Sequence, residues 1–406
     1  MSKRALIAKY FNDIRASYWF LPTILALLAV VLAQVTLYVD HTFQILPEGW
    51  RTTQVEGARS TLALISQSMI GVAGVMFSMT IVAVSFASGN FGPRLIGNFM
   101  RDRGNQWSLG ILIATFVYTL LILRAVQSQF GPEDNGAAFV PHLSLAIALG
   151  LTAIAVMSMI YFVHHIPEII NVSNITAELG ARLQSALKTY ISRDEDHVAV
   201  DAGPFPSRDA DEQFFLANSG YIQTWNRQRL AELAQEHSLF ISIDRVAGDF
   251  VSPSTPILNV WTTSSLSDDL VHKLKDCFAL GSVPTEAQNP EFIVAQLVEM
   301  VARAMSPGVN DPFTAINCIN WMYVGLSTAA NYEGGIRARP QGRLRYRTIS
   351  FEAILKSAVG NIAPYVRDDR IVSAHLAQIL ERLQSETDNA TALALLRETE
   401  DRLSLA

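Results

Sequence analysis

Four long apolar stretches in the first half of the sequence limit what this chain can fold into. They run near Trp19–Val39, Leu62–Phe86, Trp107–Leu123 and Val140–Val163. Each is long enough to cross the roughly 30 Å hydrocarbon layer of a bilayer, which takes about 20 helical residues. Because lipid cannot hydrogen-bond the backbone, each stretch is expected to be a transmembrane helix. The first stretch is not a cleavable signal peptide, since its apolar run exceeds the usual length of about 7–15 residues.

Charged residues are sparse through these stretches and return to ordinary density after Glu178. The chain as a whole carries 17% charged residues, against about 25% in soluble domains. The second half is therefore expected to fold in water. The sequence predicts an α-helical membrane protein with four transmembrane helices, followed by a C-terminal cytoplasmic α+β domain made of a small β-containing module and a helical part.

Five segments follow from this division. Apolar residues at helical spacing precede the first span, and a segment of this kind either lies flat in the headgroup layer or packs on the cytoplasmic domain. The predicted segments are an interfacial amphipathic segment at 1–17, the four-helix transmembrane domain at 18–168, a helical connector and linker at 169–212, a small α+β module at 213–265 and a mainly helical domain at 266–406.

Basic residues near the ends of the spans predict the orientation of the chain. Lys3, Arg4, Lys9 and Arg15 precede the first span, and Arg94, Arg101 and Arg103 lie between the second and third. Short cytoplasmic loops carry the excess of Lys and Arg, so both termini of this inner-membrane protein are predicted to be cytoplasmic. The net charge of −6 argues against nucleic acid as a partner, because phosphate binding needs a basic surface.

The second span carries a stripe of small and weakly polar residues. Its helical pattern continues from about Glu56 to Ser88, which is longer than a bilayer core requires. Helical spacing places on one face the residues Ser60, Gln67, Gly71, Gly74, Ser78, Ser85 and Ser88. Ile81 is the only large apolar residue that interrupts this face in its inner half.

Two interpretations of the stripe compete. Small residues commonly let a neighbouring transmembrane helix approach closely. Alternatively, copies of this helix line an aqueous path with Ile81 as a dewetting constriction, and the lining is then Gln67, Gly71, Gly74, Ser78, Ile81, Ser85 and Ser88. The core of each span lacks Asp, Glu, Lys and Arg, which disfavours a proton relay or a charge-coupled transporter.

A sharp corner is predicted between two amphipathic helices at Glu291–Met305 and Phe313–Leu326. Gly308 is expected to end the first helix, Asp311 to cap the second, and Pro312 to fill its first position. The segment that we treat as a signature comprises Arg303, Ser306, Pro307, Gly308, Asn310, Asp311 and Pro312. Local backbone chemistry accounts for each of these turn residues.

A basic run consists of Arg337, Arg339, Arg343, Arg345 and Arg347. The last three alternate, so on a strand they would share one face. They could contact anionic lipid headgroups or a small anionic ligand, or they could protect a solvated edge strand by their charge.

Motifs for catalysis are absent from the sequence, which has no phosphate-binding glycine loop, nucleophile elbow or dinucleotide fingerprint. His164, His165 and Glu168 form the nearest metal candidate, but a site needs a further convergent ligand. No metal or cofactor is predicted. Cys277 and Cys318 have no metal-type or redox spacing and are expected to be reduced, structural thiols.

The stretch Met69–Asn105, the Tyr161–Ile166 segment that leaves the fourth span, and Arg303–Ala315 resemble a bacterial family of predicted membrane proteins, domain of unknown function 2254. The resemblance covers nearly the whole chain, with departures such as Gly92, where the family often has serine. It implies an N-terminal membrane region and a C-terminal cytoplasmic domain, and it supplies no catalytic residues.

Three hypotheses for function remain open. The first is a homo-oligomeric channel that the second helix lines and the C-terminal domain gates or assembles. The second is a membrane-anchored sensor or scaffold whose C-terminal domain binds a partner or small ligand. The third is a membrane-bound enzyme, with His165, Glu168, Asn310 and Asp311 as its candidate residues.

Overall fold

The structure is a computed structural model that describes residues 17–43, 53–95, 99–100, 102–126, 139–195, 205–332, 342–347 and 349–404. The described residues divide into two compact units. One contains the four apolar helices and extends to Asn171; the other contains the short segment Asn90–Gly92 and the chain from Val172 onward. The predicted interfacial segment at 1–17 lies, except for Ser17, outside the described residues, as do Arg337 and Arg339.

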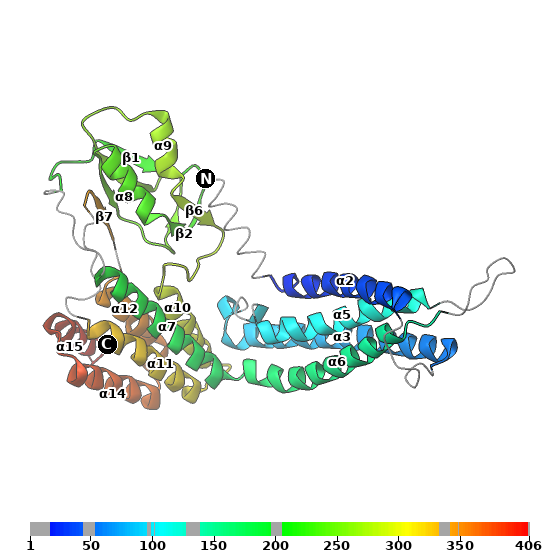
Figure 1. Ribbon diagram of the computed structural model, residues 1–406. Helices are drawn as coiled ribbons and strands as arrows, with labels where there is room; N and C mark the ends of the chain where they lie inside the picture. The colour runs from blue at the N-terminus through cyan, green and yellow to red at the C-terminus, as the bar shows by residue number, and fades with distance from the viewer. Residues whose placement is uncertain are drawn as a thin grey trace. The chain divides into compact units, whose positions relative to one another are not determined.

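The four predicted spans are all helices that are long and apolar enough to cross a membrane. They are α2 (Phe20–Thr42), α3 (Val55–Phe91), α5 (Arg103–Ala125) and α6 (His142–Ile169), shown in blue to green in Figure 1. The described N-terminal half therefore has the membrane architecture that the sequence predicts. A 3-10 turn, η2 (Pro93–Leu95), follows α3.

The central helix of the membrane unit is α5. In the most apolar 18-residue stretch of each helix, the buried share is 44% in α5, 28% in α3 and 22% in both α2 and α6. One apolar cluster joins Met69 and Met76 of α3 to Leu112 of α5 and Phe162 of α6. A second joins Ala33 of α2 to further residues of α3, α5 and α6, namely Leu62, Tyr118, Ile122 and Ala148. Each of the other three helices thus buries one side and leaves the rest of its surface exposed.

Buried polar groups inside this unit find partners across the helices. Thr36 of α2 and Tyr118 of α5 pair their hydroxyls at 3.0 Å, and the Tyr118 hydroxyl donates to the Ser144 carbonyl at 3.2 Å. Ser66 of α3 and Thr119 of α5 pair at 2.7 Å. Because an unpaired hydroxyl costs free energy in hydrocarbon, these contacts fix which helix faces meet.

Asp40, in the last turn of α2, binds the first turn of α6. Its carboxylate accepts hydrogen bonds from the backbone N–H of Leu143 at 2.9 Å, from the N–H of Ser144 at 2.8 Å and from the Ser144 hydroxyl at 2.6 Å. The first N–H groups of a helix have no partners within it and carry the positive end of its dipole. Asp40 therefore caps α6 from another helix.

The second unit begins with α7 (Val172–Glu195) and continues into a small α+β module with two sheets. One sheet has the order β1-β5-β3-β7, with β3 and β7 parallel and the other neighbours antiparallel; the other sheet has the order β4-β2-β6 and is antiparallel. The strands are β1 (Glu212–Phe215), β2 (Gly220–Trp225), β3 (Phe240–Ile243), β4 (Phe250–Val251), β5 (Pro256–Trp261), β6 (Phe278–Gly281) and β7 (Leu344–Tyr346).

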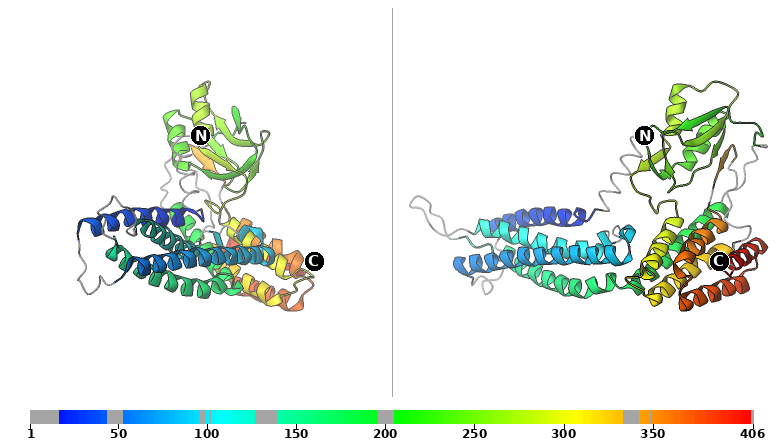
Figure 2. Two further views of the ribbon diagram at one scale, coloured as in Figure 1. Left: turned by 90° about the vertical axis from the view of Figure 1, so that its right-hand side faces the viewer. Right: turned by 180° about the vertical axis from the view of Figure 1, so that it is seen from behind.

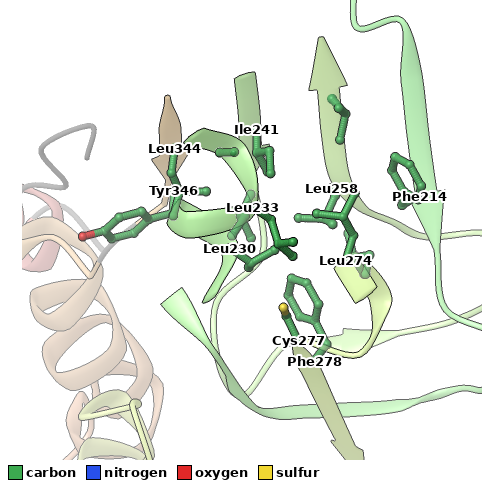
Figure 3. Packing of buried hydrophobic residues seen from close by; sticks show 14 of the residues in the cluster. Phe214, Leu230, Leu233, Ile241, Leu258, Leu274, Cys277, Phe278, Leu344 and Tyr346 are labelled. Carbon is green, nitrogen blue, oxygen red and sulfur yellow. The ribbon is translucent and has the colours of Figure 1, made fainter. Parts of the chain in front are cut away.

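The helices α8 (Arg227–Glu236) and α9 (Asp268–Lys275) supply the other side of the core of this module. Leu230 and Leu233, three residues apart on α8, point toward Ile241 and Leu258 of the sheet (Figure 3). Ser267 caps α9, since its hydroxyl accepts a hydrogen bond from the Leu270 N–H. This core includes Leu344 and Tyr346 of β7, the strand that the alternating arginines flank and include.

The remaining helices are α10 (Glu291–Ala304), α11 (Pro312–Ala330), α12 (Phe351–Leu355), α13 (Asn361–Val366), α14 (Arg370–Glu386) and α15 (Ala390–Ser404). In both figures of the whole chain they pack with α7 as a helical group (Figures 1 and 2). The C-terminal unit therefore combines strands and helices, as the predicted α+β class requires.

The helices α7 and α11 run parallel to each other. Ser173 hydrogen-bonds Asn317 at 3.5 Å, and Gln184 hydrogen-bonds Thr328 at 3.4 Å. Between these contacts, Gly180 lies so close to Trp321 that a Cβ would come within 2.4 Å of its ring. Residue numbers rise together on both helices, so α11 begins at the end of the unit where α7 begins.

One local expectation is wrong. Gly308 does not end α10, which stops at Ala304, and the left-handed residue is Asn310 with φ of 47°. The reversal falls at Asn310 because the N–H of Asp311 reaches back to the Ala304 carbonyl at 2.8 Å, and Asn tolerates this conformation.

Between α12 and α13 the chain forms a π-helical turn, η3 (Lys356–Gly360). Pro364 follows within α13. Since proline has no N–H to donate to the carbonyl four residues earlier, regular α-helical bonding cannot pass through this stretch.

Candidate functional site

The stripe on α3 faces away from the other helices of its own chain. Gln67, Gly71, Gly74, Ser78, Ile81 and Ser85 are exposed, and Ser88 is half-buried. A Cβ built on Gly71 or Gly74 would meet nothing within 4 Å. Gly71 and Gly74 therefore do not serve close packing against the described part of the chain.

The buried face of α3 lies nearly opposite. At steps of three and four residues it contains Ala58, Leu62, Ile65, Met69, Ala73, Met76, Thr80, Ala83, Ala87 and Phe91, and Ser66 is buried beside them. At about 100° per residue, these positions centre roughly 150° around the helix from the stripe. The side of α3 that packs in the unit and the side that carries the polar groups are thus separate surfaces.

This exposed surface combines a carboxamide, hydroxyls and bare backbone with one large apolar residue. Gln67 lies in the apolar part of the helix, where an amide without water or a partner costs several kcal/mol by order of magnitude. Ile81 has 47% of its surface exposed on the same side. Chemically, such a surface can contact water, or it can hydrogen-bond and pack against another chain.

A second polar cluster, which the sequence did not predict, joins α5 to α6. Asp102 caps α5, accepting from the Asn105 N–H at 2.8 Å, and pairs with Nε2 of His165 at 2.9 Å. Tyr161 stacks on the His165 ring with centroids 5.0 Å apart. Gly104 permits this approach, because a Cβ there would lie 2.5 Å from the Tyr161 hydroxyl and 2.8 Å from His165 Nε2.

The candidate metal and enzyme residues therefore have other partners. His165 binds Asp102, while the neighbouring His164 lies 3.4 Å from Glu168. Among the described residues, no group of three or more His, Cys, Asp or Glu side chains is placed to hold a metal ion. Asp311 caps α11, as predicted, through the N–H and hydroxyl of Thr314 at 3.1 and 2.6 Å.

The signature corner between α10 and α11 is tightly bonded. The Ser306 hydroxyl donates to the Arg303 carbonyl at 2.6 Å, and the Val309 and Asn310 N–H groups donate to the Ser306 carbonyl at 3.0 and 2.9 Å. Pro307, Gly308 and Asn310 are exposed. Two apolar residues of this corner, Val309 and Phe313, are also exposed, and the sequence pattern gave no sign of it.

Arg345 lies on the edge strand β7, and Arg343 and Arg347 flank that strand. Leu344 and Tyr346 between these arginines are buried. Arg343 lies over the Phe240 ring at 4.7 Å, and Arg345 over the Phe205 ring at the same distance. Arg345 also donates from Nε to the Ser242 hydroxyl at 3.3 Å. These contacts hold two of the guanidinium groups against the sheet.

The two cysteines are free and buried. Cys277 lies in the core of the small module (Figure 3), where burial raises the pKa of its thiol to about 11. Burial raises the pKa of Cys318, on α11, to about 12. Both thiols are therefore protonated at neutral pH, as structural cysteines are.

Taken together, the four apolar helices and the C-terminal α+β unit define a multi-pass membrane protein with a large domain outside the spans. The family model described as predicted membrane protein DUF2254 matches residues 15–382. The chain belongs to this family.

Similar proteins occur in mycobacteria. Uncharacterized protein Rv1290c of Mycobacterium tuberculosis and Uncharacterized protein Mb1321c of Mycobacterium bovis are each 28% identical to this chain over 332 residues. The match covers 80% of this chain and 63% of each relative. No solved structure matches the chain.

Proposed function

We propose that this protein forms a homo-oligomeric membrane channel whose path is lined by α3, with the C-terminal unit assembling or gating it. The observation that carries the proposal is the exposure of the weakly polar stripe on the side of α3 opposite its packing face. A single chain leaves Gln67, Ser78 and Ser85 exposed, and in a bilayer these polar groups would contact lipid. If several copies were arranged around a central axis, these polar groups would line an aqueous path and hydrogen-bond water.

Ile81 is the proposed constriction. In a ring of α3 helices it would project between the hydroxyl-bearing turns of Ser78 and Ser85. Hydrophobic constrictions gate channels by excluding water from a narrow segment. Replacing Ile81 with a polar residue would therefore let water fill the constriction and raise the leak conductance of the channel.

The proposed orientation places both termini in the cytoplasm of a bacterial cell, with the C-terminal unit on the same side. The support is the number of basic residues before α2 and around Arg94 and Arg103, compared with those at the other ends of the spans. Gating signals would then reach the channel from the cytoplasm.

The test is conductance of the purified full-length protein in planar bilayers. Wild-type protein should conduct, and Ile81→Ser should raise the leak. Ile154→Ser is the matched control, because Ile154 is an exposed isoleucine of α6 with 53% of its surface accessible, and it should leave conductance unchanged.

Silence of the reconstituted protein under voltage, tension and ligand screens would count against the channel. If substitutions at Gly71, Ser78 and Ser85 then altered only the oligomeric state, the stripe would be a packing surface between chains and the channel would be abandoned.

A further inference from the structure

The sheet β1-β5-β3-β7 of the small module buries one face against α8 and α9, and its other face carries polar and aromatic side chains. The strand register places one residue of each strand side by side in a row, namely Gln213, Asn259, Ser242 and Arg345. In every strand a neighbouring residue lies in the core, so the alternation of side chains directs this row away from α8 and α9. We call this side of the sheet its outer face.

The polar side chains of the row are hydrogen-bonded to one another and to Asp244. Gln213 donates to the side-chain oxygen of Asn259 at 3.1 Å, and the Asn259 amide donates to the Asp244 carboxylate at 2.8 Å. The Ser242 hydroxyl donates to the other Asp244 oxygen at 3.2 Å and accepts from Nε of Arg345 at 3.3 Å. Two neutral donors therefore engage this carboxylate.

Aromatic rings fix two guanidinium groups on the outer face. Arg343 lies over the Phe240 ring and Arg345 over the Phe205 ring, each at 4.7 Å. The two rings contact each other with centroids 5.2 Å apart, and Phe205 also contacts Trp261 at 5.4 Å. Because the rings touch, both guanidinium groups lie on the same side of the sheet and close together.

The positive charge of this pair is not neutralised within the described part of the chain. Apart from the rings, Arg343 donates to the Ser238 carbonyl at 3.0 Å, and Arg345 donates to the serine hydroxyl of the row. Both acceptors are neutral, and the nearby carboxylate of Asp211 pairs with Arg208 instead. A guanidinium group has more N–H donors than these contacts use. The pair therefore retains both charge and donors for a ligand.

The way in which the arginines are held favours binding over protection of the sheet edge. Charge alone protects an edge strand from pairing, and mobile side chains would supply it. Here each guanidinium group is fixed by a ring and a hydrogen bond. The planar fork of arginine matches the oxygens of a phosphate group, and a fork held in advance loses less entropy when it binds.

We propose that the outer face binds a small soluble phosphate ester, whose phosphate oxygens accept hydrogen bonds from Arg343 and Arg345. The amide and hydroxyl groups of the row lie beside the arginines and can contact the rest of the ester. A flat anionic lipid surface would also bring its charge against the exposed carboxylate of Asp244, whereas a small ligand can contact the arginines alone. The proposal does not depend on whether the protein conducts.

The test is equilibrium binding of radiolabelled inorganic phosphate to the full-length protein in maltoside micelles, which contain no phosphate. The wild type should bind phosphate saturably, and Arg345→Gln should raise the dissociation constant about tenfold or more, because hydrogen bonds between charged partners are the strong ones. Arg345→Lys keeps the charge and the apolar stem but loses the fork, so it should also weaken binding. Arg397→Gln removes the same charge from an exposed position of α15 and should leave binding unchanged.

Absence of phosphate binding, or equal binding by the wild type and both Arg345 variants, would overturn the proposal. A second arm compares the wild type in vesicles of phosphatidylcholine alone and of phosphatidylcholine with phosphatidic acid. Undiminished phosphate binding in both vesicles supports a soluble ligand. If phosphatidic acid displaced the bound phosphate, the occupant would be a lipid headgroup and the soluble ligand would be rejected.

Discussion

Replacing Asp40 with alanine should loosen the start of α6. The carboxylate accepts three hydrogen bonds, from the N–H groups of Leu143 and Ser144 and from the Ser144 hydroxyl. Loss of an N-cap costs about 0.5–2 kcal/mol, and a buried hydroxyl left unpaired costs about 1–3 kcal/mol. Ser144 is fully buried while Asp40 is only half-buried, so water can replace part of what is lost. We expect a local destabilisation of about 2–4 kcal/mol.

Hydrogen exchange measured by mass spectrometry on the peptide that begins α6 is the direct assay, because the two units need not unfold together. At a factor of ten per 1.4 kcal/mol, Asp40→Ala should speed exchange there by roughly 30-fold to several hundred-fold. Asp40→Asn keeps one acceptor oxygen, so its exchange rate should lie between those of the wild type and Asp40→Ala. Gln34→Ala, at an exposed position of α2, is the control. Unchanged exchange in Asp40→Ala would show that the cap contributes nothing to α6.

Two further results are expected. Gly104→Ala should destabilise the membrane unit by about 1–3 kcal/mol in thermal unfolding, because the new methyl group must displace the Tyr161 hydroxyl and the His165 ring, and so disturb the His165–Asp102 pair. Gly150→Ala on α6, where nothing lies within 4 Å, should be neutral or stabilising, and equal effects would refute the reasoning. Since burial raises the pKa of Cys277 to about 11 and of Cys318 to about 12, maleimide should label neither thiol at pH 7 unless denaturant is added. Both folded pKa values lie above the ordinary 9.0, so the stability from the neutral thiols is present below pH 9 and is lost as the pH rises through 11 and 12. Native labelling at pH 7 would contradict the burial.

The helices of the membrane unit could be predicted from the sequence because apolar length and helical periodicity are local properties of the chain. A helix in lipid must satisfy its own backbone, so apolar length alone located α2, α3, α5 and α6. The predicted ends differ from the observed ones most at the start of α3, Val55 instead of Leu62, and at the end of α6, Ile169 instead of Val163. The stripe of α3 followed from helical periodicity. Its exposure did not, because which face of a helix packs inward depends on the partners that the other helices supply.

Contacts between distant residues could not be predicted. Asp40 with Ser144 and Asp102 with His165 join residues far apart in the chain, and no spacing rule connects them. In the C-terminal unit, the caps at Ser267 and Asp311 were predictable from adjacent residues, whereas β1, β4 and β6 are too short to show alternation. Exposure of Phe313 was unexpected because an aromatic residue at a helix start ordinarily indicates a core position.

Helix α3 has 37 residues, about 55 Å of helix, and the sequence between Arg59 and Arg94 has no charged side chain. A bilayer core of about 30 Å can therefore take different portions of this rod without drawing an ion into hydrocarbon. Thicker and thinner membranes would select different tilts, each at a fraction of a kcal/mol per Å. Lipid chain length would thus change the tilt angle of α3, and with it the direction in which Ile81 and its neighbours point.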